Sequence, residues 1–296
     1  MIERYLIQYF LAVTDHGNFS RAAQQCRVSQ PTLSVGIAKL EGLVGHVLFH
    51  RPNRRVELTS AGAAFATHAR RIEAEFARAA QAMAGDAPTK LVRIGLLSTL
   101  PGRWVEAATR AACAVEGERI EIVEGRMRDL TPRLERGRID VMIGMLDESA
   151  DAADSLFSEG YALAMAADHP LARHAALEPE AVAGAEMIVR RNCEALAQVS
   201  RFFTRRGVRP FFAARTADDE RAVSYVKAGL GITVMPRCFA QPGMAMPALA
   251  GFDQRRRIGL IADPAARKRI EHSASLQRFA EAIRAMAAEM SAAEPA

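Results

Sequence analysis

The sequence predicts a multidomain protein with a mainly α-helical N-terminal domain, one long linker helix and a C-terminal α/β domain of two lobes. The 296 residues are more than one hydrophobic core usually organises. Apolar residues recur at helical spacing through about the first 83 positions, whereas short β-prone runs alternate with helical stretches after residue 90. We expect domains at 1–60, 61–88 and 89–296, the last divided into one lobe of 91–161 with 265–296 and another of 162–264.

The charge distribution favours a polyanionic partner for the N-terminal domain. Half of the residues are hydrophobic and a quarter are charged, and the formal net charge is +5. Residues 1–90 hold 11 Lys and Arg against 7 Asp and Glu, whereas residues 91–296 hold 28 against 27. A basic excess concentrated in a small unit is compatible with binding to double-stranded DNA.

No segment predicts export, a membrane span or a metal site. The apolar runs fall short of the roughly 18 residues that cross a bilayer. The N-terminus lacks a basic start followed by an apolar core and a cleavage site. The four cysteines lie far apart without a C-x-x-C pair, so we expect reduced thiols. The expected protein is cytoplasmic, with no cofactor, no metal and no membrane partner.

The first two helices are predicted from apolar spacing and from the polar residues that can cap them. Leu6, Phe10 and Val13 recur at helical spacing, and residues 16–18 interrupt the pattern. Ser20 is the expected N-cap of the second helix, because a serine hydroxyl accepts a hydrogen bond from a free N–H of the first turn.

The third helix combines one apolar face with an outer face of small side chains. Ser29 is its expected N-cap, and a proline follows in the first turn, where its missing N–H would be unbonded anyway. Leu33, Ile37 and Leu40 follow at spacings of 4 and 3 and commit one face to packing. The second and third helices predict a helix-turn-helix whose second helix enters a major groove; a protein-docking module is the alternative. The residues expected on the outer face are Pro31, Thr32, Ser34, Val35, Ala38 and Lys39.

A wing is predicted after the third helix. Residues 47–58 form two short β-prone runs around a Pro-Asn turn. This turn displays Arg51, Arg54 and Arg55, which either approach DNA or are solvated charge.

A long helix with a heptad-like apolar seam is predicted from residue 61 to about residue 85. Thr59 is its expected N-cap. A lone helix cannot hide such a seam, so we expect a homodimer, with packing against the chain's own C-terminal domain as the alternative. The seam consists of Phe65, Ile72, Phe76, Ala79 and Met83.

Beyond residue 90 the alternation of strands and helices predicts a mostly parallel sheet flanked by helices, in two lobes. The expected strands include residues 91–97, 119–125, 139–145, 161–170 and 186–191.

Motifs in a fixed order resemble those of the LysR-type transcriptional regulators across essentially the whole chain. They are "NFSRAA", "VSQPTLS", "IAKLEGLVG", "LFHRPNRRVELTSAG", "ERGRIDVMIG", "DHPLA" and "VKAGLGITVMP". The resemblance implies a winged helix-turn-helix, a dimerisation helix and an effector domain folded like a periplasmic binding protein, with a small molecule bound between its lobes. It also implies a homodimer that usually assembles into a homotetramer.

The resemblance places part of the third helix and the wing against DNA. Gln30 can pair with adenine, and Arg51 would gain from the negative potential of a narrow minor groove. Val35 and Gly36 stand where many relatives carry Arg and another polar residue, so Val35 offers bases only apolar contacts. The predicted DNA-binding residues are Ser29, Gln30, Pro31, Thr32, Ser34, Val35, Lys39, Arg51, Arg54 and Arg55.

A second set of residues is predicted to bind the effector. Ser98 and Thr99 lie between a strand and a helix, where hydroxyls and free N–H groups can hold an anion, or where they merely cap the helix. Arg190 or Arg191 could clamp a carboxylate, or each is surface charge. Cys193 is either an oxidant sensor, as in some members of the family, or an inert thiol. The predicted effector-binding residues are Ser98, Thr99, Met127, Arg190, Asn192 and Cys193, with Met127 placed near the floor of the cleft by the resemblance.

Two other function classes remain as alternatives to a regulator. A solute-binding protein with a front docking module would need an export signal. An α/β enzyme would need a convergent acid, base or nucleophile, and none of the common catalytic motifs is present in the sequence. We therefore predict a DNA-binding regulator that is not an enzyme and is controlled by a small, anionic effector, such as a carboxylate.

Overall fold

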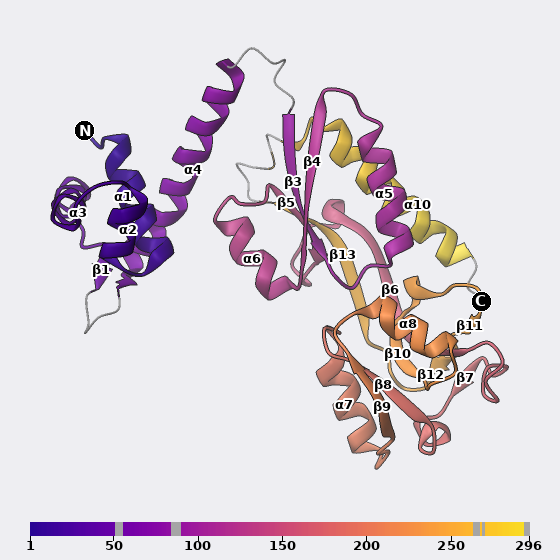
Figure 1. The fold of residues 1–296 in the computed structure, drawn as a ribbon. Helices are drawn as coiled ribbons and strands as arrows, with labels where there is room; N and C mark the ends of the chain where they lie inside the picture. The colour runs from indigo at the N-terminus through magenta and orange to yellow at the C-terminus, as the bar shows by residue number, and fades with distance from the viewer. Residues whose placement is uncertain (51–55, 84–89, 263–266, 268–269, 293–296) are drawn as a thin grey trace. The chain divides into compact units, whose positions relative to one another are not determined.

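The computed structural model describes residues 1–50, 56–83, 90–262, 267 and 270–292 (Figure 1). The chain divides into two compact units, Met1–Thr89 with Pro132–Ile139, and Lys90–Thr131 with Asp140–Ala296. The finer boundaries expected at residues 60 and 88 and between the lobes stay predictions.

Three helices open the N-terminal unit: α1 (Arg4–His16), α2 (Phe19–Gln25) and α3 (Gln30–Val44). Gly17 ends α1 in a left-handed conformation, with φ of 60°. The expected cap of α2 was wrong by two residues. Asn18 takes this position, because its Oδ1 accepts the N–H groups of Ser20 and Arg21 at 2.8 and 3.1 Å.

The limits of α3 confirm the expected capping residues. The hydroxyl of Ser29 accepts the Thr32 N–H at 3.2 Å, and Gly45 ends the helix with φ of 73°. The inner face packs into a core from which water is excluded. Its fully buried members include Leu6, Phe10, Val13, Ala22, Leu33, Ile37 and Leu40.

Two short strands and a long helix follow. β1 (Phe49–His50) pairs antiparallel with β2 (Glu57–Leu58), which confirms the predicted pair of wing strands. The wing arginines Arg51, Arg54 and Arg55 lie outside the described residues. The Thr59 hydroxyl accepts the Gly62 N–H at 2.9 Å and thereby caps α4 (Ser60–Met83).

A nine-stranded sheet organises the C-terminal unit, with the order β4-β3-β5-β13-β6-β12-β7 and with β10 and β11 also paired to β6. A separate pair, β8 and β9, is parallel. The strands are β3 (Lys90–Leu97), β4 (Glu118–Gly125), β5 (Val141–Met145), β6 (Ser155–Ala166), β7 (Ala176–Leu177), β8 (Glu186–Arg190), β9 (Phe211–Thr216), β10 (Thr233–Pro236), β11 (Met244–Ala245), β12 (Ala248–Leu249) and β13 (Arg255–Ile261).

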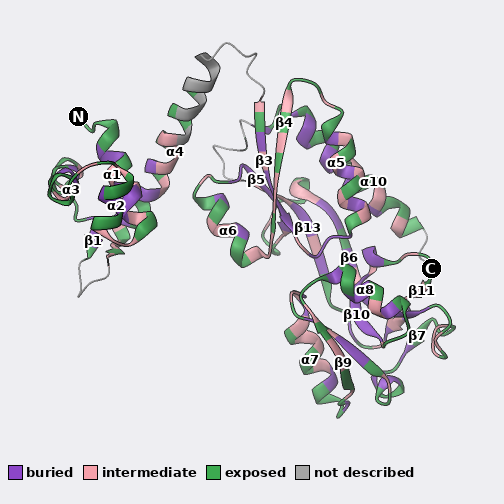
Figure 2. Cartoon of the chain, viewed as in Figure 1, coloured by how far each residue is buried: buried purple, intermediate pink, exposed green. Residues whose placement is uncertain are grey.

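The expectation of a mostly parallel sheet was wrong: pairing is parallel at the two edges, where β12 is parallel to β7, but antiparallel around β6 and β13 at the centre. β3 is parallel to β4 and β5, but β13 runs antiparallel to β5 and to β6. The first half of β6 pairs with β13 and its second half with β10 and β11. β6 therefore runs through both parts of the sheet, and it is buried over most of its length (Figure 2).

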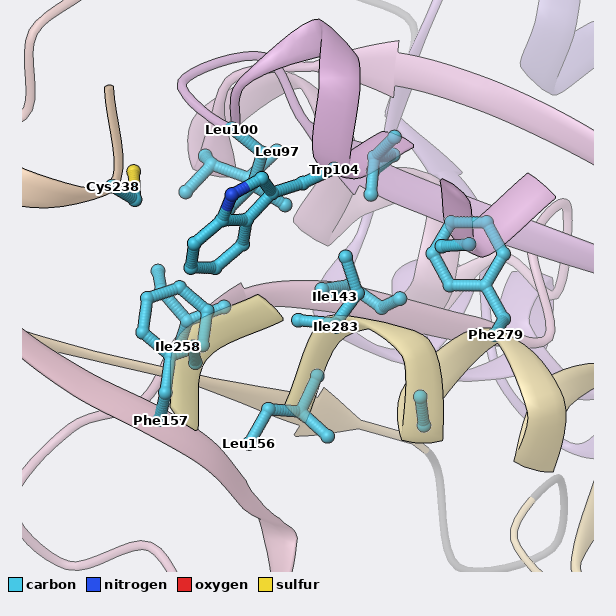
Figure 3. Packing of buried hydrophobic residues seen from close by; sticks show 14 of the residues in the cluster. Leu97, Leu100, Trp104, Ile143, Leu156, Phe157, Cys238, Ile258, Phe279 and Ile283 are labelled. Atoms are coloured by element: carbon cyan, nitrogen blue, oxygen red, sulfur yellow. The ribbon is translucent and has the colours of Figure 1, made fainter. Parts of the chain in front are cut away.

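Helices cover the sheet and complete two apolar clusters, one around Trp104 and another that includes Phe203 of α7. Trp104 of α5 is 1% exposed, and its ring centroid lies 5.2 Å from that of Phe157 on β6 (Figure 3). Phe279 and Ile283 of α10 are buried in the same cluster. The helices are α5 (Gly102–Cys113), α6 (Met127–Glu135), α7 (Leu196–Arg205), α8 (Asp219–Lys227) and α10 (Ala274–Ala292), with 3-10 turns at η1 (Ala152–Asp154), η2 (Pro179–Val182) and η3 (Arg237–Phe239).

In the described part of the chain, no helix has the length and apolar character needed to cross a bilayer.

Candidate functional site

The outer face of α3 is open to solvent. Pro31, Thr32, Val35, Ala38 and Lys39 are all exposed, and Ser34 is half-buried. The predicted residues of α3 therefore lie together on one accessible surface. A helix presented in this way can enter a major groove.

Gly36 does not belong to this surface. It is buried, and a Cβ built at this position would lie 2.6 Å from Cδ2 of Tyr9 on α1. The missing side chain thus allows α1 and α3 to approach closely. Gly36 therefore faces the interface between α1 and α3, and of Val35 and Gly36 only Val35 lies on the outer face.

Lys39 is held at the edge of the same surface. Its Nζ lies 3.0 Å from Glu3 Oε1 and donates to the Tyr5 hydroxyl at 3.3 Å. The hydrogen bond with Glu3 raises the pKa of Lys39. Both partners are about half exposed, so the pair adds little to stability.

The apolar seam of α4 is open in a single chain. Ile72 and Phe76 expose 39% and 43% of their surfaces. The Arg4 guanidinium lies 4.3 Å from the centroid of Phe76 and pairs with Glu73 at 2.9 Å. Part of Phe76 is thus covered by an arginine, and Phe65 packs into the N-terminal core, where its ring centroid lies 5.0 Å from that of Phe10. Ile72 and Ala79 are exposed and free to pack against another surface.

Charged side chains meet inside the C-terminal unit around Arg256, which is 1% exposed. Arg256 of β13 stands directly opposite Glu159 of β6, and its Nε donates to Glu159 Oε1 at 2.9 Å. Its Nη1 and Nη2 donate to the hydroxyl and carbonyl oxygens of Thr99, both at 3.0 Å. Nη1 also donates to Glu194 Oε1. We call these four residues, Thr99, Glu159, Glu194 and Arg256, the Arg256 cluster.

The Arg256 cluster joins loops from distant parts of the sequence. Thr99 follows β3, whereas Glu194 follows β8, and Tyr161 donates to Glu194 Oε1 at 2.9 Å. Burial alone would raise the pKa of Glu194, but the charge of Arg256 overcomes this effect and lowers it. Ser98 Oγ and Glu194 Oε2 are buried without a hydrogen-bond partner among the described residues.

Arg190 lies in a second buried ion pair and is not an open clamp. Its Nε donates to Asp219 Oδ1 at 2.8 Å, and its Nη1 donates to the Val234 carbonyl at 3.1 Å. Both side chains of the pair are nearly inaccessible. The expected direct contact between Arg190 and an effector therefore needs correction: Asp219 already occupies the guanidinium fork.

Cys193 is a buried, reduced thiol. Burial raises its pKa, and the charge of Arg190, whose Nη1 lies 3.4 Å from Sγ, only partly offsets this. Cys238, the other cysteine in this region, is also free, and burial raises its pKa well above the ordinary value. Thiols in such surroundings react slowly.

The remaining predicted residues have identified contacts. Asn192 donates its amide to the Ala217 carbonyl at 2.7 Å and ties two loops together. Met127 packs its sulfur against Gly144 and accepts the Met145 N–H at 3.3 Å. Met127 and Ser98 lie at the carboxyl ends of β4 and β3, the edge at which parallel sheets bind ligands.

A carboxylate already occupies the start of α5. Glu220 Oε1 of α8 accepts the Gly102 N–H at 2.7 Å. Free N–H groups and the helix dipole favour an anion at this place. The anion-binding role expected for Ser98 and Thr99 stays a prediction, since the carboxylate observed here is bound by the N–H of Gly102.

A cavity of about 990 Å³ lies beside α7, and its lining is mostly apolar. Arg190, Cys193 and Glu194 are among the residues that line it. The described residues contain no group of three or more His, Cys, Asp or Glu side chains arranged to hold a metal ion.

Sequence reasoning missed Glu159, Glu194 and Arg256. Glu159 shares a strand face with the buried Phe157 and Tyr161, and Arg256 shares one with the buried Ile258. The available signal was a charged residue on the strand face whose other residues are apolar. It marks a buried pair when two such strands are neighbours.

Two family models match the chain. The model described as "Bacterial regulatory helix-turn-helix protein, lysR family" covers residues 5–63, and "LysR substrate binding domain" covers residues 85–288. A probable hydrogen peroxide-inducible genes activator of Mycobacterium avium is 32% identical over 269 residues, 86% of each chain. The DNA-binding transcriptional dual regulator OxyR of Escherichia coli is 29% identical over 291 residues, 94% of each chain.

Solved structures share the fold. A full-length OxyR variant from Pseudomonas aeruginosa has a TM-score of 0.62 and 23% identity, covering 96% of this chain and 95% of that one. Full-length CbnR in complex with its target DNA has a TM-score of 0.56 and 22% identity, covering 96% and 100%. The two family models and the relative from Mycobacterium avium show that the chain belongs to the LysR family of DNA-binding transcription regulators.

Proposed function

We propose that this regulator binds its DNA sites through the exposed face of α3, as a dimer joined by the seam of α4, and that it acts in the cytoplasm without enzymatic activity. The observation that carries the proposal is the accessible row of Pro31, Thr32, Val35 and Ala38 on a helix matched by the family's DNA-binding model. Ser29 caps the same helix and Gln30 begins it, and in this proposal they contact phosphates and bases.

The experiment is a fluorescence anisotropy titration of the full chain with the promoter region beside its own gene. The proposal predicts a complex that prefers this duplex over a shuffled one and weakens steeply as salt increases, because bound cations are released from the phosphates. Equal affinity for both duplexes would contradict it.

Dimerisation is supported by the open seam at Ile72 and Phe76. A second apolar surface, Phe211 and Phe212 of β9, exposes 71% and 41% and supports assembly beyond the dimer. Sedimentation of the Phe76→Glu variant measures the contribution of the α4 seam to dimerisation, and loss of the dimer is the expected result. The matched variant Phe211→Glu is expected to keep the dimer and to lose only the tetramer.

The effector is proposed to be a small anion that binds at the start of α5, where it replaces the Glu220 carboxylate. Ser98 Oγ, which is buried without a described partner, would donate to it, and Asn192 and Cys193 lie on the loop after β8 that faces this region in the family's binding mode. An effector shifts the lobes only by its differential affinity for two arrangements. Losing the Glu220 contact supplies that difference.

A thermal-shift screen of small carboxylic acids tests the effector site, because a ligand that binds only the folded state raises the melting temperature. Ser98→Ala should abolish the shift by any hit, whereas Ser158→Ala, an exposed serine on β6, should preserve it. Identical shifts in both variants would remove Ser98 from the site.

Oxidant sensing is a second candidate, because several relatives are named for induction by hydrogen peroxide. Cys193 would carry it, with Arg190 Nη1 3.4 Å from its sulfur. The raised pKa of this thiol disfavours the reactive thiolate. If DNA affinity changes after peroxide treatment in the native chain and stays constant in Cys193→Ser, this candidate replaces the anionic effector.

A further inference from the structure

The exposed side of α3 carries a second apolar seam, opposite the buried one. Pro31, Val35, Ala38 and Gly42 follow one another at spacings of 4, 3 and 4, and all four are exposed. Val35 exposes 69% of its surface at the centre of this seam. A helix that is apolar on both sides is normally covered on both sides, so a partner is expected here.

The surrounding charges indicate that DNA is that partner. The acidic residue of α3, Glu41, turns its Oε1 to the N–H groups of Leu48 and Phe49 at 2.7 and 3.3 Å. The seam is flanked instead by Thr32 and Lys39. The outer face of α3 therefore presents no carboxylate of its own to repel phosphates.

We propose that Val35 reads the C5-methyl group of a thymine in the major groove. The inference rests on the proposed function and adds the base chemistry that α3 recognises. In the major groove the thymine methyl is the feature that distinguishes a base pair by an apolar contact, since all other signals are hydrogen-bond donors or acceptors. A valine side chain has no polar atom with which to read those.

The geometry of the seam suits this contact. Pro31 and Ala38 lie about 6 and 4.5 Å from Val35 along the helix axis, close to one or two base-pair steps of 3.4 Å. Their small side chains let the backbone of α3 approach the bases. Lys39, one turn beyond Val35, is held by Glu3 and Tyr5, which leaves Val35 as the largest exposed side chain at the centre of the seam.

The test begins with selection of preferred duplexes from a random pool by the full chain. Each thymine of the selected site is then replaced singly by deoxyuridine, which keeps every hydrogen-bonding group and removes only the methyl. The inference predicts one position at which this replacement weakens binding about fourfold, the factor that burial of one methyl group supplies.

Val35→Ala identifies the protein partner of that methyl. This variant should bind the thymine and deoxyuridine duplexes equally, because its shorter side chain no longer reaches the methyl. Leu230→Ala is the matched control, since Leu230 is 38% exposed and lies in the C-terminal unit, outside the proposed DNA-binding surface. It should keep the full fourfold preference, and circular dichroism should show both variants folded.

Each outcome decides between explanations. Failure to select any sequence would overturn the proposed function itself. A selected site that is insensitive to every deoxyuridine, or a methyl preference that survives in Val35→Ala, would overturn only the thymine contact. Equally, a change in sedimentation of Val35→Ala without a change in DNA affinity would show that a second copy of the chain covers the seam.

Discussion

The two units of the molecule differ in whether they bury charged side chains. In the described part of residues 1–83 no polar or charged side chain is classed as buried, whereas the C-terminal unit buries Glu159, Arg190, Asp219 and Arg256. The N-terminal core thus gains its stability from apolar packing of a few short helices. The C-terminal core includes two ion pairs, Arg256 of β13 with Glu159 of β6 and Arg190 of β8 with Asp219 of α8. Replacement of one partner leaves the other charge buried and unpaired.

This difference is measurable because the single tryptophan, Trp104, lies in the C-terminal core. Its fluorescence reports unfolding of the C-terminal unit, whereas far-ultraviolet circular dichroism reports both units. A variant in the C-terminal core should therefore shift the unfolding transition in both signals, whereas a variant in the N-terminal core should shift it only in circular dichroism.

The largest effect is expected for Arg256→Met. This change keeps much of the side-chain volume but strands the carboxylates of Glu159 and Glu194, and should lower the free energy of unfolding of the C-terminal unit by about 3–5 kcal/mol. Urea denaturation followed by Trp104 fluorescence measures it. Arg255→Met, a change at an exposed neighbour, should stay within about 0.5 kcal/mol. Similar midpoints for the two variants would show that the Arg256 cluster does not support the fold.

A somewhat smaller effect is expected for Ile37→Ala in α3. Ile37 is fully buried, and its truncation should destabilise the N-terminal unit by about 2–5 kcal/mol. Val35→Ala on the opposite side of the helix should change stability by no more than about 0.5 kcal/mol. For Ile37→Ala the denaturation midpoint measured by circular dichroism should fall, whereas the midpoint measured by Trp104 fluorescence should equal that of the native chain. Loss of both signals at one midpoint would mean that the two units unfold together.

The smallest effect is a pH dependence at Glu118 of β4. Burial opposes ionisation of Glu118, but hydrogen bonds from Ser275 and Ser273 at the start of α10 prevail and lower its pKa from 4.5 to about 2. A depressed folded-state pKa stabilises the fold above pH 4.5, and this contribution is lost as the pH falls from 4.5 to 2.

Glu118→Gln should therefore reduce the pH dependence of the Trp104 denaturation midpoint between pH 5 and pH 2. Glu121→Gln on the same strand, where the carboxylate is half exposed, is the control and should follow the native curve. Superimposable curves for the native chain and Glu118→Gln would exclude this contribution.

The contrast between the units also explains what the sequence can predict. Spacing alone identified the buried face of α3, the caps at Ser29 and Thr59, and the order of strands and helices, because each depends on local periodicity or on one hydrogen bond. Asn18 was missed because Asn18 and Ser20, two residues apart, are both types that can cap a helix. The packing role of Gly36 could not be predicted from spacing, because it depends on contact with Tyr9 from another helix.

The effector region was less predictable for the same physical reason. Ser98, Thr99 and Cys193 stood out as isolated polar residues near strand ends. Arg256 and Glu159 become partners only when β13 and β6 pair in one register. Likewise, nothing in the sequence indicates that Arg190 is paired. In the structure its guanidinium donates to Asp219, which lies on a helix distant in the sequence. Long-range pairing is not encoded in local spacing.

The most direct test concerns the outer face of α3. Ala38→Glu places a carboxylate on this exposed seam without disturbing the buried face, and Ala285→Glu makes the same change on the exposed side of α10. Anisotropy titrations of both full-length variants with the promoter duplex decide the matter. The account predicts that Ala38→Glu loses affinity by on the order of 100-fold while Ala285→Glu binds as the native chain does. Native affinity in a folded Ala38→Glu variant would contradict the assignment of this surface to DNA.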